Sequence, residues 1–132
     1  MNKVVARFLD GRILKGNTND FFPGKPVFHA TPADAAAGSK PLEIQIKDLK
    51  AVFFVKDFSG KPQHRKRQEF DPGRPPVGRK IKVVFKDDEV MVGTTQGYQP
   101  DRPGFFMVPA DSESNNERCY VFSASAKQIE LL

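Results

Sequence analysis

The sequence repeats itself at a spacing of 77 residues, and this repeat limits the folds open to the chain. Aligned without a gap, residues 8–34 and 85–111 share 10 identities in 27 positions, where background composition would give roughly one or two. The identical residues of the first copy are mainly aromatic, glycine or turn-forming residues: Phe8, Asp10, Gly16, Thr18, Pro23, Pro26, Phe28, Pro32, Ala33 and Asp34. The chain is therefore predicted to hold two copies of one small unit, residues 1–55 and 78–132, joined by a linker of residues 56–77.

Within each copy the hydrophobic pattern has the period of β-strands. Apolar side chains alternate between two faces over residues 4–9 and 81–86, as in strands with one buried face. Asp10-Gly11 and Asp87-Asp88 follow these segments as hairpin turns. Five short strands fit into each copy, and no window shows a sustained helical period. The pattern predicts an all-β protein made of two tandem five-stranded barrels.

The order of these segments resembles that of a known family. A strand, an Asp-Gly turn, a strand with a central glycine, a third strand, a polar loop and two closing strands is the order of Sm-like (LSm) small barrels. Residues 8–16, Phe-Leu-Asp-Gly-Arg-Ile-Leu-Lys-Gly, look like the first half of that family's first motif. SH3-like barrels share much of the layout. The resemblance implies small barrels that associate edge to edge.

The RNA site of the Sm-like family does not carry over to this sequence. That site uses an Asp-containing loop ending in Asn and an Arg-Gly pair near the last turn. The corresponding loops here, residues 20–24 and 97–101, have no Asn at that place, and Lys47-Asp48 and Ala124-Ser125 stand where Arg-Gly would fall. The resemblance therefore implies a barrel without a particular ligand.

The loops after the second strand of each copy are the best candidates for ligand binding. Each places an amide group and an aromatic ring shortly before a cation, a combination that binds nucleic-acid bases and also peptides. An ordinary structural loop that closes the barrel is the alternative. The candidate ligand-binding residues are Asn19, Phe21, Lys25, Gln96, Tyr98 and Arg102.

The positive charge of the chain is concentrated in its first copy and in the linker. Residues 1–55 carry 8 Lys/Arg against 5 Asp/Glu, residues 56–77 carry 6 against 3, and residues 78–132 carry 7 against 8. The linker contains several Pro and Gly residues and reads as irregular, and Phe58 and Phe70 are apolar enough to hold it against a barrel. Arg65, Lys66 and Arg67 are the candidate phosphate contacts, unless they belong to a solvated loop.

The sequence contains little from which a catalytic site is built. It has two histidines, one cysteine and no nucleophile, phosphate-loop or zinc motif. The aspartates that recur in both copies belong to turns. We expect no enzyme activity, no cofactor and no metal. No apolar segment is long enough to span a membrane, and a cytoplasmic location is expected.

These observations favour a non-catalytic binding or scaffolding protein. A protein partner or self-association of the barrels is the first hypothesis, with the oligomeric state left open. Binding of RNA or single-stranded DNA through the basic linker and the paired loops is the second. The positions at which the two copies differ are candidates for function: His29 against Phe106, Lys47-Asp48 against Ala124-Ser125, and Lys40-Pro41 against Glu117-Arg118.

Overall fold

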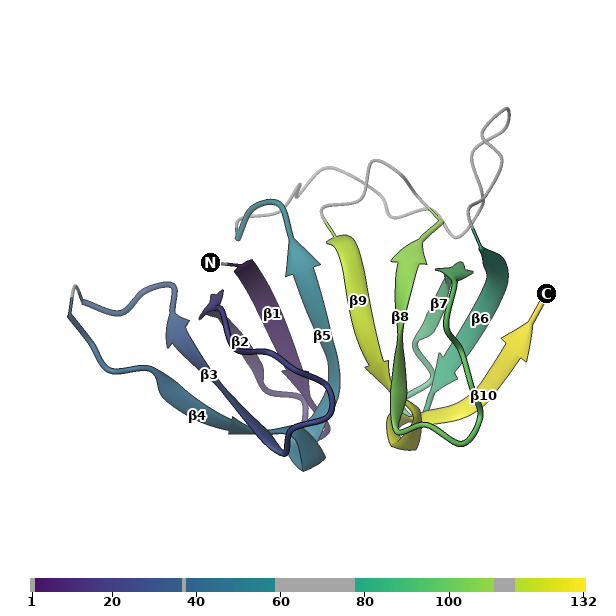
Figure 1. Ribbon diagram of the computed structural model, residues 1–132, viewed down its shortest axis with the longest axis horizontal. Helices are drawn as coiled ribbons and strands as arrows, with labels where there is room; N and C mark the ends of the chain where they lie inside the picture. The colour runs from purple at the N-terminus through teal and green to yellow at the C-terminus, as the bar shows by residue number, and fades with distance from the viewer. Residues whose placement is uncertain (1, 37, 59–77, 111–115) are drawn as a thin grey trace.

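The computed structural model describes residues 2–36, 38–58, 78–110 and 116–132. The described chain is all-β, as predicted, with two short 3-10 turns (Figure 1). No helix in these ranges is long and apolar enough to cross a membrane. The elements are β1 (Asn2–Phe8), β2 (Ile13–Thr18), β3 (Val27–Pro32), β4 (Leu42–Gln45), η1 (Ile46–Asp48), β5 (Leu49–Val55), β6 (Arg79–Phe85), β7 (Val90–Thr95), β8 (Gly104–Pro109), β9 (Asn116–Phe122), η2 (Ser123–Ser125) and β10 (Ala126–Leu131).

The elements recur with the period of the sequence repeat. β1, β2, β3, η1 and β5 begin 77 residues before β6, β7, β8, η2 and β10. The two predicted hairpin turns are present, with φ of +93° at Gly11 and +71° at Asp88. In each turn the aspartate side chain accepts a hydrogen bond from the backbone N–H two residues later, at Arg12 and at Glu89. Asp-x turns of this kind stabilise tight reversals of the chain.

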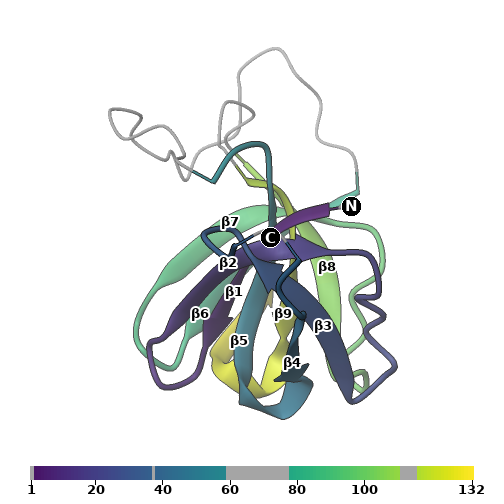
Figure 2. The same ribbon diagram turned by 90° about the vertical axis from the view of Figure 1, so that its left-hand side faces the viewer.

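The strands form one continuous antiparallel sheet of ten strands, in the order β10-β6-β7-β8-β9-β5-β1-β2-β3-β4. The expected two tandem five-stranded barrels are not confirmed, because β5 and β9 pair along their length and the sheet is not closed. Figure 1 shows the two halves curling beside each other with β5 and β9 at the centre, and Figure 2 shows the first half in front of the second. The halves are thus one sheet, with β4 and β10 at its ends.

Strand β5 is buried along its whole length because it serves two hydrophobic cores. Leu49, Val52 and Phe54 pack in the core of the first half, together with β1, β3 and β4. Ala51, Phe53 and Val55 point the other way, into the core of the second half. A strand covered on both faces is expected to be apolar throughout, which explains the run of apolar residues from Ala51 to Val55.

Strand β9 likewise contributes side chains to the cores of both halves. Cys119 and Val121 pack in the core of the second half, whereas Tyr120 and Phe122 pack in the core of the first. Each half therefore completes its core with side chains from the other half.

The glycines within β2 and β7 have a different role from the bulge or bend that strand glycine suggests. The β1–β2 and β6–β7 registers run through Gly16 and Gly93 without a shift. A Cβ at these positions would lie 2.6 Å from the carbonyl oxygen of Thr31 and 2.0 Å from that of Val108. These glycines allow the next strand of each half to approach closely.

The linker enters the described structure only at its start. Phe58 packs against the core of the second half, and its carbonyl oxygen accepts a hydrogen bond of 3.0 Å from Lys15 Nζ. The expectation that Phe58 holds this segment against the sheet is therefore confirmed. Phe70 and the rest of the linker lie outside the described residues.

Candidate functional site

A groove of about 530 Å³ lies between the β2–β3 loop and the β7–β8 loop. Its walls come from both halves of the chain: Pro23 and Gly24 on one side, Gln96, Gly97, Arg102 and Pro103 on the other. Its floor is formed by β8 and β9, through Gly104, Phe105, Phe106 and Tyr120. The two loops singled out in the sequence therefore face one another across a single depression.

The floor of the groove is aromatic. The rings of Phe106 and Tyr120 meet edge to face, with centroids 4.9 Å apart. Gly104 makes this arrangement possible, because a Cβ there would lie 2.4 Å from Tyr120 Cε1 and 2.5 Å from the carbonyl oxygen of Val121. Phe106 stays 37% exposed, whereas Tyr120 is 6% exposed. Phe106 is therefore the ring that a ligand in the groove can cover.

Arg118 extends this aromatic floor beyond the groove. Its guanidinium carbon lies 4.4 Å from the ring centroid of Phe54 and 4.9 Å from that of Phe106, within the range of cation–π contact. Phe54 and Arg118 also line a smaller, polar hollow of about 290 Å³, together with Lys3 and Lys56. The arginine thus contacts the floor of the groove through Phe106 and also lines the smaller hollow, where Glu117 places a negative charge beside the cations.

The phenol of Tyr120 is held in its neutral form. Burial raises the pKa of this hydroxyl above its ordinary value of 10.0, and the positive charge of Arg102 offsets only part of the effect. A neutral hydroxyl both donates and accepts hydrogen bonds. Tyr120 can therefore meet either a carbonyl or an N–H group of a ligand.

Three of the six candidate binding residues belong to the groove or its walls. Gln96 and Arg102 line it, and Arg102 Nε donates a hydrogen bond of 2.8 Å to Gln99 Oε1, which fixes the guanidinium within its loop. Lys25 lies in the opposite wall loop beside Gly24, with its Nζ 5.0 Å above the ring of Phe22.

The other three candidate residues have no comparable place in the groove. Phe21 is partly buried against the core of the first half, with its ring centroid 5.0 Å from that of Phe28. Tyr98 packs in the same way on Phe105, at 4.9 Å. These two rings close the ends of the cores, which is the structural alternative given above. Asn19 is exposed at the start of its loop.

The candidate phosphate contacts Arg65, Lys66 and Arg67 lie outside the described residues. The structure therefore places none of them relative to the groove.

The sequence comparison of the copies did mark one floor residue, Phe106, although not as part of a site. Phe106 replaces His29, whose Nδ1 lies 2.8 Å from Asp20 Oδ2, and Gly97 replaces Asp20. Partial burial works to raise the pKa of Asp20, but hydrogen bonds from the backbone N–H and ring of His29 outweigh it and lower that pKa. The second half lacks both members of this polar pair and has an exposed ring at the position of the histidine.

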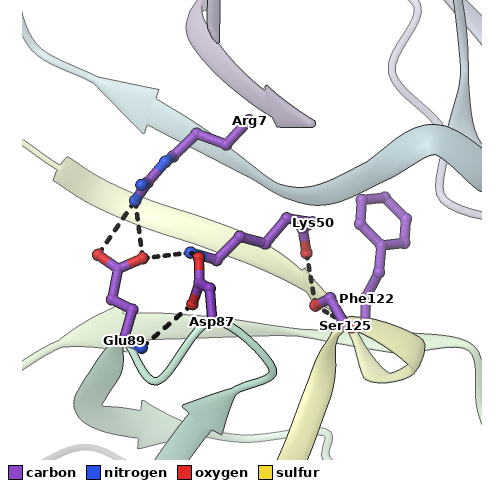
Figure 3. A network of polar contacts seen from close by, with 6 residues as sticks. All are labelled: Arg7, Lys50, Asp87, Glu89, Phe122 and Ser125. Carbon is purple, nitrogen blue, oxygen red and sulfur yellow. Dashed lines mark hydrogen bonds and ion pairs between the residues drawn. The ribbon is translucent and has the colours of Figure 1, made fainter. Parts of the chain in front are cut away.

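A second polar cluster lies where β5 meets the β6–β7 turn (Figure 3). Lys50 Nζ contacts Asp87 Oδ2 at 2.7 Å and Glu89 Oε1 at 2.5 Å, and Arg7 Nη1 contacts the two oxygens of Glu89 at 2.8 and 3.1 Å. The Lys50 side chain is 6% exposed. The cluster therefore joins two cations of the first half to two carboxylates of the second.

The charges of this cluster hold the pKa values of its acids down. The hydrogen bond from Lys50 lowers the pKa of Asp87. Burial works to raise the pKa of Glu89, but Lys50 and Arg7 outweigh it and the net change is downward. Each charge thus has a partner of opposite sign, as expected of a structural ion-pair network. No group of three or more His, Cys, Asp or Glu in the described ranges has the arrangement of a metal site.

Comparison with known proteins gives a family and no function. The whole chain, residues 1–132, matches the model of a family of unknown function, DUF6982. The chain belongs to this family. No curated protein and no solved structure matches it.

Proposed function

We propose that this chain is a non-catalytic binding protein that holds an extended peptide segment of a partner protein in the groove. The observation that carries the proposal is the exposed ring of Phe106, which lies in a groove walled by loops of both halves and has the guanidinium of Arg118 stacked on it. Aromatic residues and arginine are enriched in protein interfaces and dominate their binding energy. The partner segment is expected to carry an apolar side chain that covers Phe106.

The charges around the groove favour an acidic partner. Arg102 lines the groove, and the guanidinium carbon of Arg118 lies 4.9 Å from the ring centroid of Phe106 on its floor. Lys25 stands on the wall loop, with an exposed side chain. Complementary charge steers association and fixes the register of a bound segment. An acidic residue beside the apolar one is therefore expected in the bound peptide.

Single-stranded RNA is the second candidate, supported by the same rings and cations and by the basic linker. Bases bind such surfaces by stacking on exposed aromatic faces. Tyr120 is 6% exposed and Phe106 is 37% exposed, so the groove offers one incomplete face for stacking. The geometry is better suited to a peptide side chain that inserts between the loops.

The proposal is tested with a displayed library of random short peptides, selected on the full-length protein. We expect enrichment of acidic sequences with an aromatic or aliphatic residue, and loss of their binding in Phe106→Ala and Arg118→Ala. Leu9→Ala is the matched control, because Leu9 is an exposed apolar residue on the β1–β2 turn. It should leave binding unchanged.

An oligouridylate probe is measured beside the peptides by fluorescence anisotropy at two salt concentrations. Binding of a nucleic acid weakens steeply as salt rises, because counterions are released. If no peptide is enriched and the oligouridylate binds in a salt-sensitive way that is lost in Phe106→Ala, RNA would be the ligand of the groove in place of a peptide. Absence of both would overturn the assignment of the groove.

A further inference from the structure

The junction between β5 and β9 has a counterpart at the free ends of the sheet. β5 is the last strand of the first half and β9 the fourth of the second. At the ends of the sheet lie β4, the fourth strand of the first half, and β10, the last strand of the second. A second molecule placed head to tail would bring its β4 beside β10 in the same antiparallel arrangement.

The side chains that make the junction apolar are replaced by polar ones at these ends. In the junction, Tyr120 and Phe122 of β9 enter the core of the other half. The positions 77 residues earlier, on β4, hold Glu43 and Gln45. Ile44 between them is buried in its own core, so these two side chains occupy the outward face of the edge.

The same replacement of apolar by polar side chains is found on β10, the strand at the opposite end of the sheet. Ala51 and Phe53 of β5 enter the core of the second half, and the positions 77 residues later, on β10, hold Gln128 and Glu130, both exposed. Leu132 keeps the apolar character of Val55. A β4–β10 junction would place a carboxylate in each of the two cores that it joined, which is strongly unfavourable for an unpaired charge.

One of the two ion pairs that Lys50 makes across the junction is changed in the same sense. Lys50 contacts both Asp87 and Glu89 of the other half. In a head-to-tail contact Lys127, the counterpart of Lys50, would still face Asp10 at the place of Asp87, but it would face Arg12 at the place of Glu89. Arg12 is bonded to Asp10 of its own turn at 2.8 Å. One of the two attractive contacts of the internal junction would thus become a contact between like charges.

We propose that β4 and β10 are equivalent in position to the strands of the β5–β9 junction but carry polar side chains that prevent them from pairing. The contact therefore forms once within the chain and never between chains. Polar residues and charges on edge strands are a known way to prevent pairing between sheets. Four outward positions and one turn residue carry this restriction: Glu43, Gln45, Gln128, Glu130 and Arg12. A second copy of the chain is therefore excluded as a partner at these edges.

The test restores the junction residues to the free edges, one edge at a time. The first variant carries Arg12→Glu, Glu43→Tyr and Gln45→Phe, and the second carries Gln128→Ala and Glu130→Phe. Each keeps one polar edge, so each alone should stay monomeric in light scattering, with a cooperative thermal transition. Mixed in equal amounts, they should form a one-to-one dimer, and a chain with all five substitutions should form longer head-to-tail oligomers.

Three results would overturn the proposal. One is a wild-type protein that is already oligomeric and becomes monomeric in Glu43→Lys or Glu130→Lys. Another is a mixture of the two folded single-edge variants that stays monomeric. The third is self-association of each single-edge variant alone to the same extent as in the mixture, because this would show general stickiness of added apolar residues.

Discussion

Lys50 is the most informative residue of the network that joins the two halves. The substitution Lys50→Met keeps an unbranched apolar side chain against the ring of Phe85, which lies 4.5 Å from the ammonium. It removes both ion pairs of the ammonium. The carboxylates left behind belong to side chains that are 56% exposed at Asp87 and 35% exposed at Glu89, and Glu89 retains Arg7.

The expected cost of Lys50→Met is therefore small. Ion pairs with this degree of solvent exposure contribute at most about 1 kcal/mol, and the substitution also removes the desolvation penalty of a buried ammonium. We expect a loss of about 1 kcal/mol in the free energy of unfolding.

Removing the acceptors instead should cost more. Asp87→Asn with Glu89→Gln leaves the ammonium of Lys50, 6% exposed, without a negative partner. Breaking a buried pair in this way costs about 3–5 kcal/mol, and because the amide oxygens still accept hydrogen bonds we expect the lower end, about 3 kcal/mol. The triple variant should return to about 1 kcal/mol, because no unpaired buried charge remains.

Urea unfolding followed by circular dichroism measures these differences, provided that the m values of the variants agree. The reasoning is refuted if Lys50→Met destabilises the protein as much as the acceptor variant does. It is also refuted if the triple variant loses the sum of both effects.

Three further predictions concern the acids of this network, Gly104 and Tyr120. The lowered pKa values of Asp87 and Glu89 stabilise the fold fully above about pH 4.5, and this stabilisation is lost as the pH falls below that value. Acid titration of the unfolding free energy should therefore show a shallower decline in the variant that lacks both carboxylates. Gly104→Ala should cost about 1–3 kcal/mol through overpacking against the ring of Tyr120 and should abolish peptide binding, and an unchanged melting temperature would contradict this. In a Tyr98→Phe protein, phenolate absorbance should show Tyr120 ionising above its ordinary value of 10.0.

Much of the architecture was open to prediction from sequence because it depends on local pattern. Alternation marked β1 and β6, and the aspartates of the two turns marked the hairpins. The apolar run of residues 51–55 in β5 was a further signal. Such a run indicates a strand buried on both faces, yet no pattern within one copy shows that the second cover comes from the other half.

The groove was less predictable for the same reason. Gln96 and Arg102 belong to the loops that the sequence indicated, but the floor depends on how β8 and β9 lie between those loops. Aromatic residues in strands are most often part of a core. Only the contrast between His29 and Phe106 distinguished an exposed ring from a buried one.

The sharing of β5 and β9 has a consequence for how the molecule can be divided. A fragment ending after Val55 has its own five strands but lacks Tyr120 and Phe122, and its complement lacks Ala51 and Phe53. Each of the two fragments would therefore supply the core side chains that the other lacks. A chain cut between the two halves is therefore expected to reassemble, but its reassembly should depend on concentration because the covalent connection no longer holds the halves together. The protein is in this sense a natural candidate for fragment complementation.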